Sequence, residues 1–276
     1  MVCAVTHAAL GQPQYRPRAS AHFAFKGQCS LVHLGQRATE RQANTGACMR
    51  PAQRILNLHE PVEHALQIVF VDGVFDAEAS DDLSLEGVKI DRLEDICCKD
   101  IHWAKDLYGK LEERGQTPVQ RPLAALNTAF ATDGVAIHVT GKPSKPINLV
   151  YRHESEDSDA ILHHVIRVES GAEATILEAG PAASRFNKCM EIDIADNGTL
   201  HHVRAQGRDH ERRAVTHMFT RLGQESTYKS FTLTANGVLT RNEQVVELTG
   251  DDAVAHVAGA CVGDGDFHHD DTVFIT

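Results

Sequence analysis

The sequence predicts a mainly β protein in which an N-terminal α/β region precedes a parallel β-helix, a solenoid of stacked turns. Glycines punctuate the second half of the chain at intervals of 27, 25 and 27 residues, at Gly171, Gly198, Gly223 and Gly250. A near-constant period of that size is typical of stacked solenoid rungs. The runs between these glycines alternate polar and apolar residues, as strands with one buried face do. A β-sandwich also spaces its strands with turns and stays open as the alternative, but the rung period favours the β-helix.

The first predicted element is a β-hairpin, soon after the point near Ile55 where we expect order to begin. Residues 66–71 form an apolar, β-prone run, and residues 74–75 continue in the same way. Asp72 and Gly73 separate the two runs. Both residue types tolerate the positive φ angles of a tight hairpin turn, so the pair predicts the turn itself.

Two helices are predicted next. Over residues 93–114 apolar residues recur at spacings of three and four, which indicates an amphipathic helix. Gly115 suits the left-handed residue after its last turn, and Pro118 prevents the helix from resuming. A shorter helix is predicted over residues 122–130, with Pro122 in its first turn. The expected apolar stripe of the longer helix is Leu93, Ile96, Cys97, Ile101, Ala104, Leu107, Tyr108 and Leu111.

The remainder of the chain reads as strands and turns. In residues 190–194, Met and Ile alternate with Glu and Asp, and in residues 230–234, Phe231 and Leu233 alternate with Ser and Thr. This period of two predicts strands with one buried face. We therefore expect three regions: a basic and poorly ordered segment over residues 1–60, a helical region with a β-hairpin over residues 61–130, and a partial β-helix core over residues 131–276.

Composition argues against several functional classes. The net charge of -11, with His neutral, implies an acidic surface, which disfavours nucleic-acid binding. No apolar run approaches the roughly 20 residues that a membrane span needs. The seven cysteines are odd in number and contain no CxxC pair, which favours a reducing compartment over a disulfide framework. We therefore expect a cytoplasmic protein without nucleic-acid or membrane partners.

The first 60 residues differ from the rest in charge. They hold seven Arg or Lys and two acids, whereas the other 216 residues hold 20 Arg or Lys and 36 acids. A basic segment poor in acids fits an organelle transit peptide, and it also fits an unrelated or wrongly assigned start. We favour the second interpretation, because no apolar helical stripe runs through the segment.

Candidate metal ligands are plentiful, and adjacent His pairs are a feature of the chain. Neighbouring residues of a strand face opposite sides, so each pair is expected to place one ring in solvent and to hydrogen-bond the other inside. The pairs are His163-His164, His201-His202 and His268-His269.

The most ligand-rich stretch is His268-His269-Asp270-Asp271. On a strand, His269 and Asp271 share one face, and His268 and Asp270 share the other. Each face thus offers two ligands of types that zinc or iron accepts, whereas a complete site needs three or four. We assign this stretch no metal role.

The cysteines and acids indicate no reaction centre. Cys97 and Cys98 lie on a predicted helix, where neighbouring positions diverge by about 100°, so both thiolates are not expected to reach one iron. Cys189 and Cys261 are isolated in the sequence and are expected to be small buried hydrophobes. No serine-hydrolase, zinc-protease or P-loop motif occurs. We assign no catalytic, cofactor-binding or metal-binding residue and expect no enzyme.

Several segments resemble one known family. Residues 121–130, followed by Asp133-Gly134, resemble the SufB/SufD segment that leads from the helical region into the core. The other segments that carry the resemblance are 69–75, 228–233, 240–243, 247–251 and 259–272. Together they cover about residues 65–276 and favour the SufD branch of the family over the SufB branch.

The resemblance implies a right-handed parallel β-helix and a role in iron–sulfur cluster assembly. It implies SufB-like and SufC-like partner subunits, and a scaffold that assists iron acquisition without a reaction of its own. No cofactor is expected on this chain alone. Iron, the nascent Fe–S cluster and ATP would be handled by the complex, with ATP bound through SufC.

The chain also departs from the family pattern. The usual N-terminal helices are not recognisable in residues 1–60, and the family's late Cys-Ser-His segment and C-terminal helical domain have no counterpart up to Thr276. The resemblance therefore transfers no site residue. We expect an incomplete β-helix with an uncapped last rung, poor solubility and impaired assembly.

Two alternatives stay open. One is a secreted-type carbohydrate-active β-helix enzyme, which would place acidic and basic residues together on one solenoid face. The other is a stand-alone β-helical interaction module without a metal role.

Overall fold

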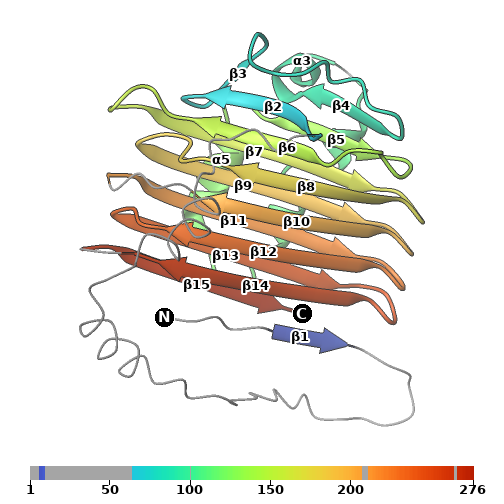
Figure 1. Cartoon of the computed structure of the whole chain (residues 1–276). Coiled ribbons are helices and arrows are strands. Elements are labelled where there is room, and N and C mark those ends of the chain that lie inside the picture. The colour runs from blue at the N-terminus through green and yellow to red at the C-terminus, as the bar shows by residue number, and fades with distance from the viewer. Residues whose placement is uncertain (1–5, 10–63, 100, 207–210, 264–265) are drawn as a thin grey trace, which may run out of the picture. The chain divides into compact units, whose positions relative to one another are not determined.

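The structure, a computed structural model, describes residues 6–9, 64–99, 101–206, 211–263 and 266–276. In these ranges two β-sheets face each other, and from residue 135 onward each successive strand belongs to the other sheet (Figure 1). Residues 64–276 of these ranges fall in one compact unit. The predictions made for residues 1–60 concern residues outside the described ranges, apart from the short strand β1 (Thr6–Ala9).

We call the two sheets A and B. In sheet A the strand order is β1, β14 (Val254–Val262), β12 (Thr227–Ala235), β10 (Thr199–Gln206), β8 (Glu173–Ala179), β6 (Ile147–Arg152), β2 (Leu66–Val71) and β3 (Val74–Asp76). In sheet B it is β15 (His268–Ile275), β13 (Leu239–Leu248), β11 (Arg213–Leu222), β9 (Arg185–Ile194), β7 (Asp159–Val168), β5 (Val135–Val139) and β4 (Val88–Arg92). The pairs β1–β14, β2–β3 and β4–β5 are antiparallel, and the other neighbours are parallel.

The register of the parallel strands confirms the predicted β-helix. His163, Cys189, His217 and Glu243 stack at equivalent positions of four successive strands of sheet B. A β-sandwich would pair its strands antiparallel, so the alternative fold is wrong. Each side chain therefore lies beside the side chain at the equivalent position of the next rung, which is one rung length away in the sequence.

An apolar core lies between the two sheets and runs from β2 to β14. Ile137, Leu149, Leu162, Ile166 and Ile192 are fully buried in it. Burying each such side chain stabilises the fold by roughly 1.5–3 kcal/mol relative to exposure. This core therefore stabilises the solenoid along its length.

The periodic glycines lie at a corner where the chain passes from sheet B to sheet A. A Cβ on Gly223 would lie 2.4 Å from an Asp196 oxygen, and one on Gly250 would lie 2.1 Å from the backbone nitrogen of Gln224. At these two positions neighbouring rungs therefore come too close for any side chain, whereas a Cβ on Gly171 would meet no atom within 4 Å. The period of the glycines reflects the length of a rung, because each of them lies in the turn between a strand of sheet B and the next strand of sheet A.

The predicted hairpin and the shorter helix are confirmed. Asp72 and Gly73, with φ angles of 47° and 82°, form the turn between β2 and β3. Helix α5 (Pro122–Phe130) begins with proline at its first turn, where the missing N–H leaves no hydrogen bond unmade.

The prediction of one helix over residues 93–114 is wrong. The segment forms three short pieces, α3 (Leu93–Cys97), the 3₁₀ helix η1 (Trp103–Asp106) and α4 (Lys110–Arg114). His102 is extended and Gly109 has a φ of 73°, so neither residue continues a helix. The apolar stripe is broken accordingly, and Ile101 is 94% exposed.

Gly115 has a different role from the predicted one. Its φ of -68° is right-handed, so it is not a left-handed cap. A Cβ at this position would lie 2.3 Å from the Phe219 ring. The glycine therefore allows the end of α4 to pack closely on strand β11.

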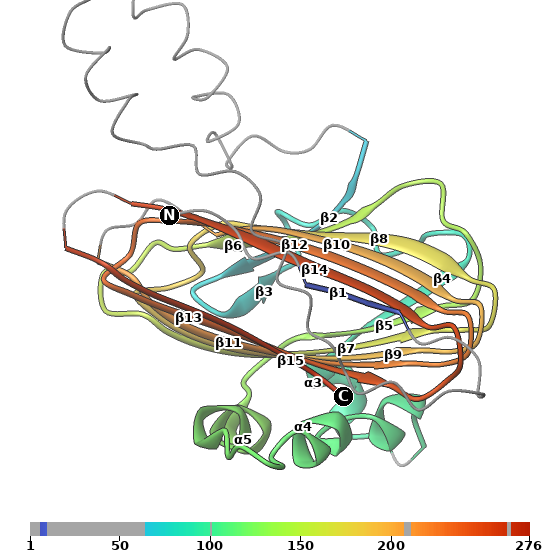
Figure 2. The same cartoon turned by 90° about the horizontal axis from the view of Figure 1, so that it is seen from below.

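The helical segment covers the outer face of sheet B (Figure 2). Ile96, Leu107 and Leu111 from this segment form a second apolar cluster with Cys189 and Phe219 of the sheet. Cys189 is fully buried in it, as the sequence predicted. None of the helices in the described ranges has the length and apolar character needed to cross a bilayer.

In β12 the Ser and Thr residues of the alternating pattern face the interior, and Phe231 faces outward. Ser230, Thr232 and Thr234 face the inside and are at most 4% exposed, whereas Phe231 is 40% exposed on the outer face of sheet A. A strand with one buried face is confirmed, but the buried face is the polar one. The later rungs thus enclose polar side chains.

Candidate functional site

The interior of the middle rungs holds a buried ionic cluster centred on Glu178 of strand β8. Lys188 of β9 reaches it from the opposite sheet and donates to Oε1 at 2.5 Å. His202 of β10 lies 2.6 Å from the same oxygen, and the Tyr151 hydroxyl of β6 donates to Oε2 at 2.7 Å. His164 of β7 lies 3.0 Å from the Tyr151 oxygen. We call these five residues the Glu178 cluster.

Burial and mutual charge set the protonation of this cluster. Burial alone would raise the pKa of Glu178, but Lys188, His202 and Arg204 together outweigh it and hold that pKa well below its usual range. Burial lowers the pKa of Lys188 to about 8, although Glu178 opposes the shift. Burial also lowers the pKa of His164 to about 3, so this ring is neutral at physiological pH. The cluster is a compensated ion pair with a neutral imidazole beside it.

A chain of hydrogen bonds continues through the interior toward the last rung. Arg204 of β10 donates to the Thr216 hydroxyl at 2.7 Å, and that hydroxyl donates to the Asn242 amide oxygen at 2.8 Å. Asn242 donates in turn to Asp271 of β15 at 2.8 Å. Cys261 donates its thiol to Asp271 at 2.8 Å. The chain thus joins three buried residues to an exposed carboxylate.

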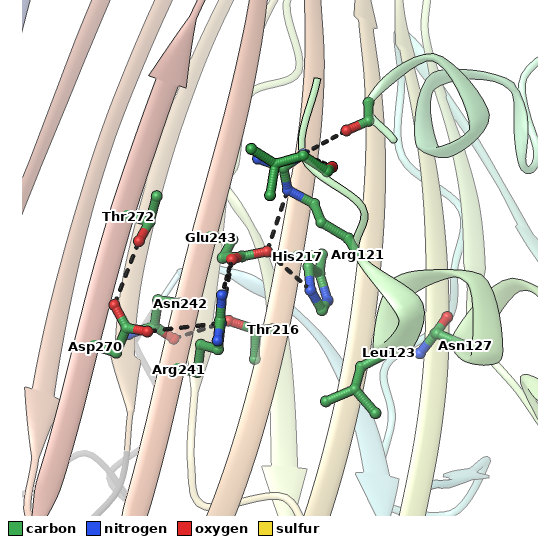
Figure 3. Close-up of polar contacts among 12 residues, drawn as sticks. Arg121, Leu123, Asn127, Thr216, His217, Arg241, Asn242, Glu243, Asp270 and Thr272 are labelled. Carbon is green, nitrogen blue, oxygen red and sulfur yellow. Dashed lines mark hydrogen bonds and ion pairs between the residues drawn. The ribbon is translucent and has the colours of Figure 1, made fainter. Parts of the chain in front are cut away.

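Glu243 lies at the centre of a second ionic cluster, on the outer face of sheet B (Figure 3). It accepts from Arg241 at 2.5 Å, and it lies 3.1 Å from His217 and 3.2 Å from Arg121. The hydrogen bond from His217, aided by Arg241, lowers its pKa to about 2. Arg121 immediately precedes α5, so Glu243 ties the helical segment to the solenoid. Arg241 also lies 3.6 Å from Asp270 in the next rung.

Glu191 on β9, two strands away from Glu243 in sheet B, forms a similar contact with the helical segment. Its carboxylate accepts the backbone N–H groups of Gly109, Leu111 and Glu112 at 2.5, 2.7 and 3.0 Å. These groups belong to the N-terminus of α4, where a negative charge is favourable. His163 lies 2.8 Å from the same carboxylate, and the His163 and Glu191 side chains are fully buried. No local pattern in the sequence indicates this contact, because its partners lie about 80 residues apart.

The adjacent His pairs follow the predicted pattern only in part. His201 is partly exposed and His202 is buried, as expected. Both rings of His163-His164 are buried, however, because the helical segment covers the outer face of sheet B and encloses His163. His268 is exposed, and the His269 ring lies 2.9 Å from the Asn236 carbonyl oxygen.

The ligand-rich stretch lies on β15, with its side chains placed as predicted. His269 and Asp271 lie at positions paired with inward-facing residues of β13, and His268 and Asp270 pair with outward-facing ones. Within the described ranges, no group of three or more His, Cys, Asp or Glu side chains is placed to hold a metal ion.

The thiols of Cys189 and Cys261 are not activated as nucleophiles. Burial raises the pKa of Cys189 well above its usual value, and burial together with Asp271 raises the pKa of Cys261 to about 12. An activated cysteine has a lowered pKa instead. Contrary to the sequence prediction, the sulfur atoms of Cys97 and Cys98 lie close together, 3.6 Å apart.

Two protein-family models match the chain. The first, described as SUF system FeS cluster assembly, SufBD core domain, matches residues 151–276, and the second, SufBD protein N-terminal region, matches residues 61–148. The chain belongs to the SufB/SufD family. No curated protein matches it.

The matched regions contain the Glu178 cluster and the contacts of Glu191 and Glu243 with the helical segment. The SufBD core match begins at Tyr151, a member of the Glu178 cluster, and the N-terminal match contains the helical segment that Glu191 and Glu243 hold. The family match supports a role of the chain in SUF iron–sulfur cluster assembly. Within the chain, the buried carboxylates of Glu191 and Glu243 join the two matched regions.

Proposed function

We propose that this chain is a SufD-type scaffold subunit of a SUF assembly complex, with no reaction of its own. It pairs with a SufB-like subunit and a SufC-like ATPase in the cytoplasm and assists iron acquisition. The chain alone binds no resident cofactor. Iron and the nascent Fe–S cluster are the cargo of the complex, and SufC binds the ATP.

The observation that carries this proposal is the match of both SufBD regions to a chain that folds as a β-solenoid with a helical segment. A scaffold needs a rigid surface and no nucleophile, and the raised pKa values of Cys189 and Cys261 agree with that role. The preference for SufD over SufB rests on the combination of resembling segments, among which residues 69–75 resemble the SufD N-terminal domain.

The family match does not favour the two alternative functions. A carbohydrate-active β-helix enzyme would need an accessible acid and base on one face. In the described ranges the most strongly paired carboxylates, Glu178, Glu191 and Glu243, are buried in ion pairs instead.

Affinity purification from the source cells tests the proposal. The chain would be tagged at its own locus, and the recovered proteins would be identified and quantified by mass spectrometry. We expect SufB-like and SufC-like subunits in near-equal amounts. Recovery of a SufD-like subunit in place of SufB would reverse the branch assignment, and recovery of no SUF subunit would overturn the scaffold role.

A further inference from the structure

Two adjacent thiols at the end of helix α3 converge at the protein surface. Cys97 is the last residue of the helix and Cys98 is its C-cap, with φ and ψ of -88° and -2°. Both side chains are exposed. The backbone of Cys98 is still in the right-handed helical region, yet the two sulfur atoms lie only 3.6 Å apart.

This separation fits chelation of a cation. Thiolates bind a tetrahedral ion such as zinc at about 2.3 Å, so two of them lie roughly 3.8 Å apart around it. A disulfide needs about 2.05 Å between the sulfur atoms, and its Cα atoms usually lie at least ~4.4 Å apart. Neighbouring Cα atoms are only about 3.8 Å apart. A cation can therefore be bound almost without movement, whereas oxidation would strain the end of α3.

Chelation of a divalent cation by the pair needs no oxidant or reductant. A thiophilic divalent cation can displace both protons, so that two S–H bonds are replaced by two metal–sulfur bonds and two protons are released.

A cavity adjoins the pair. Cys97, His102 and Tyr108 line this space of about 440 Å³, together with apolar side chains that include Leu93 and Ile96. No third described His, Cys, Asp or Glu is placed to complete a metal cage with the two thiols. A cation held here therefore keeps coordination positions open, which is the mark of an exchange site and not of a structural one.

We propose that Cys97 and Cys98 form a two-thiolate chelating site for a thiophilic cation, with open positions for an exogenous ligand that enters the adjoining cavity. The site is independent of the assembly role proposed above. It uses residues on the helical segment, whereas the buried ionic clusters lie in and on the solenoid.

Titration of the reduced full-length chain with Cd²⁺ tests the site. The probe is Cd²⁺ alone, followed by the thiolate-to-metal charge-transfer absorption and by calorimetry in two buffers of different ionisation enthalpy. We expect the tightest equivalent of Cd²⁺ to release two protons. Because two linked ligands act as a chelate, each of Cys97→Ser and Cys98→Ser should weaken this equivalent by about 10²-fold or more.

Cys261→Ser serves as the matched control, since that thiol is not part of the pair, and it should leave the tightest equivalent unchanged. Circular dichroism and thermal midpoints establish that each serine variant is folded, which is expected because both positions are exposed. Binding within about twofold of the wild type in either single variant, or release of fewer than two protons, would overturn the proposal.

Discussion

The buried ion pair between Glu178 and Lys188 makes the sharpest prediction about stability. Both side chains are at most 2% exposed, and they join the two sheets across the solenoid interior. We consider Glu178→Gln, Lys188→Met and the double variant. Gln and Met are close in shape to the residues they replace, so each change alters charge with little change in volume.

Each single change lowers the free energy of unfolding by no more than it costs to neutralise the partner that stays buried. After Glu178→Gln, Lys188 loses its proton at pH 7, which costs at most about 4.8 kcal/mol for a reference pKa of 10.5. After Lys188→Met, Glu178 takes up a proton, at a cost of at most about 3.4 kcal/mol from a reference pKa of 4.5. His202 beside it reduces that cost by offering a proton of its own.

The double variant leaves neither of the two charges in the interior. Replacing a buried pair with neutral groups of similar volume is often neutral, whereas removing one partner typically costs about 3–5 kcal/mol. We therefore expect the double variant to lie within about 1–2 kcal/mol of the wild type, with a large favourable coupling between the two changes.

Urea unfolding at pH 7 measures these differences. With a slope near 3 kcal/mol per M, a loss of about 4 kcal/mol lowers the urea midpoint by about 1.3 M. Lys229→Met is the matched control, because Lys229 is exposed on the outer face of sheet A, and its midpoint should not move. If Glu178→Gln costs less than about 1 kcal/mol, or if the two single costs simply add, the argument from the buried charge fails.

Three further predictions follow from the same contacts. Glu191→Ala should cost about 3–5 kcal/mol and release α4 to limited proteolysis, whereas Glu191→Gln should protect the helix better because it keeps an acceptor. Gly180→Ala should prevent folding, because its Cβ would lie 1.9 Å from the Tyr151 carbonyl oxygen. Gly171 is the control, since it also has a positive φ but open space around it, and thermal unfolding of Gly171→Ala should show a loss of only about 1 kcal/mol. His164 binds a proton below pH 6.5 in the unfolded chain but only near pH 3 in the folded chain. The free energy of unfolding should therefore fall on acidification across this window, by up to about 1.4 kcal/mol per pH unit. The urea midpoint of His164→Gln should depend less on pH.

Local chemistry made some elements predictable from the sequence. The Asp72-Gly73 turn needs two positive φ angles, and Pro122 fits only the first turn of a helix. The period of the glycines is the length of one rung, and at Gly223 and Gly250 the close approach of the neighbouring rung requires the glycine. Each of these signals depends on backbone constraints within a few residues or on a fixed repeat, so the sequence displays them directly.

The helical segment was mispredicted because its shape depends on distant residues. The periodicity of residues 93–114 indicates a continuous helix, yet the Glu191 carboxylate accepts three backbone N–H groups at the start of α4. Those contacts favour a new helix start at Gly109 over continuation from α3. No local signal records a hydrogen bond across about 80 residues.

The polar interior of the later rungs could not be read from alternation either. Period two shows that Ser230 and Phe231 face opposite sides, but not which side is buried. Hydrophobicity would place Phe231 inside. The structure places Ser230 there, where its hydroxyl lies 3.1 Å from the ring nitrogen of His202. A polar residue is stable inside only because a partner one rung away satisfies it, and that pairing is a property of the register.

The apolar and the polar side chains of the interior therefore have different physical consequences. Apolar side chains such as Ile137 and Ile166 stabilise the fold but tolerate alternative packing, since dispersion contacts are not directional. The polar side chains add little net stability, yet a shift of one residue would turn Glu178 out of the interior and leave Lys188 buried without its partner. The ion pair thus penalises a one-residue shift more than it stabilises the native register. On this reasoning the neutral double variant should keep most of its unfolding free energy but unfold with a smaller urea slope, because misregistered rungs would then compete with the native ones.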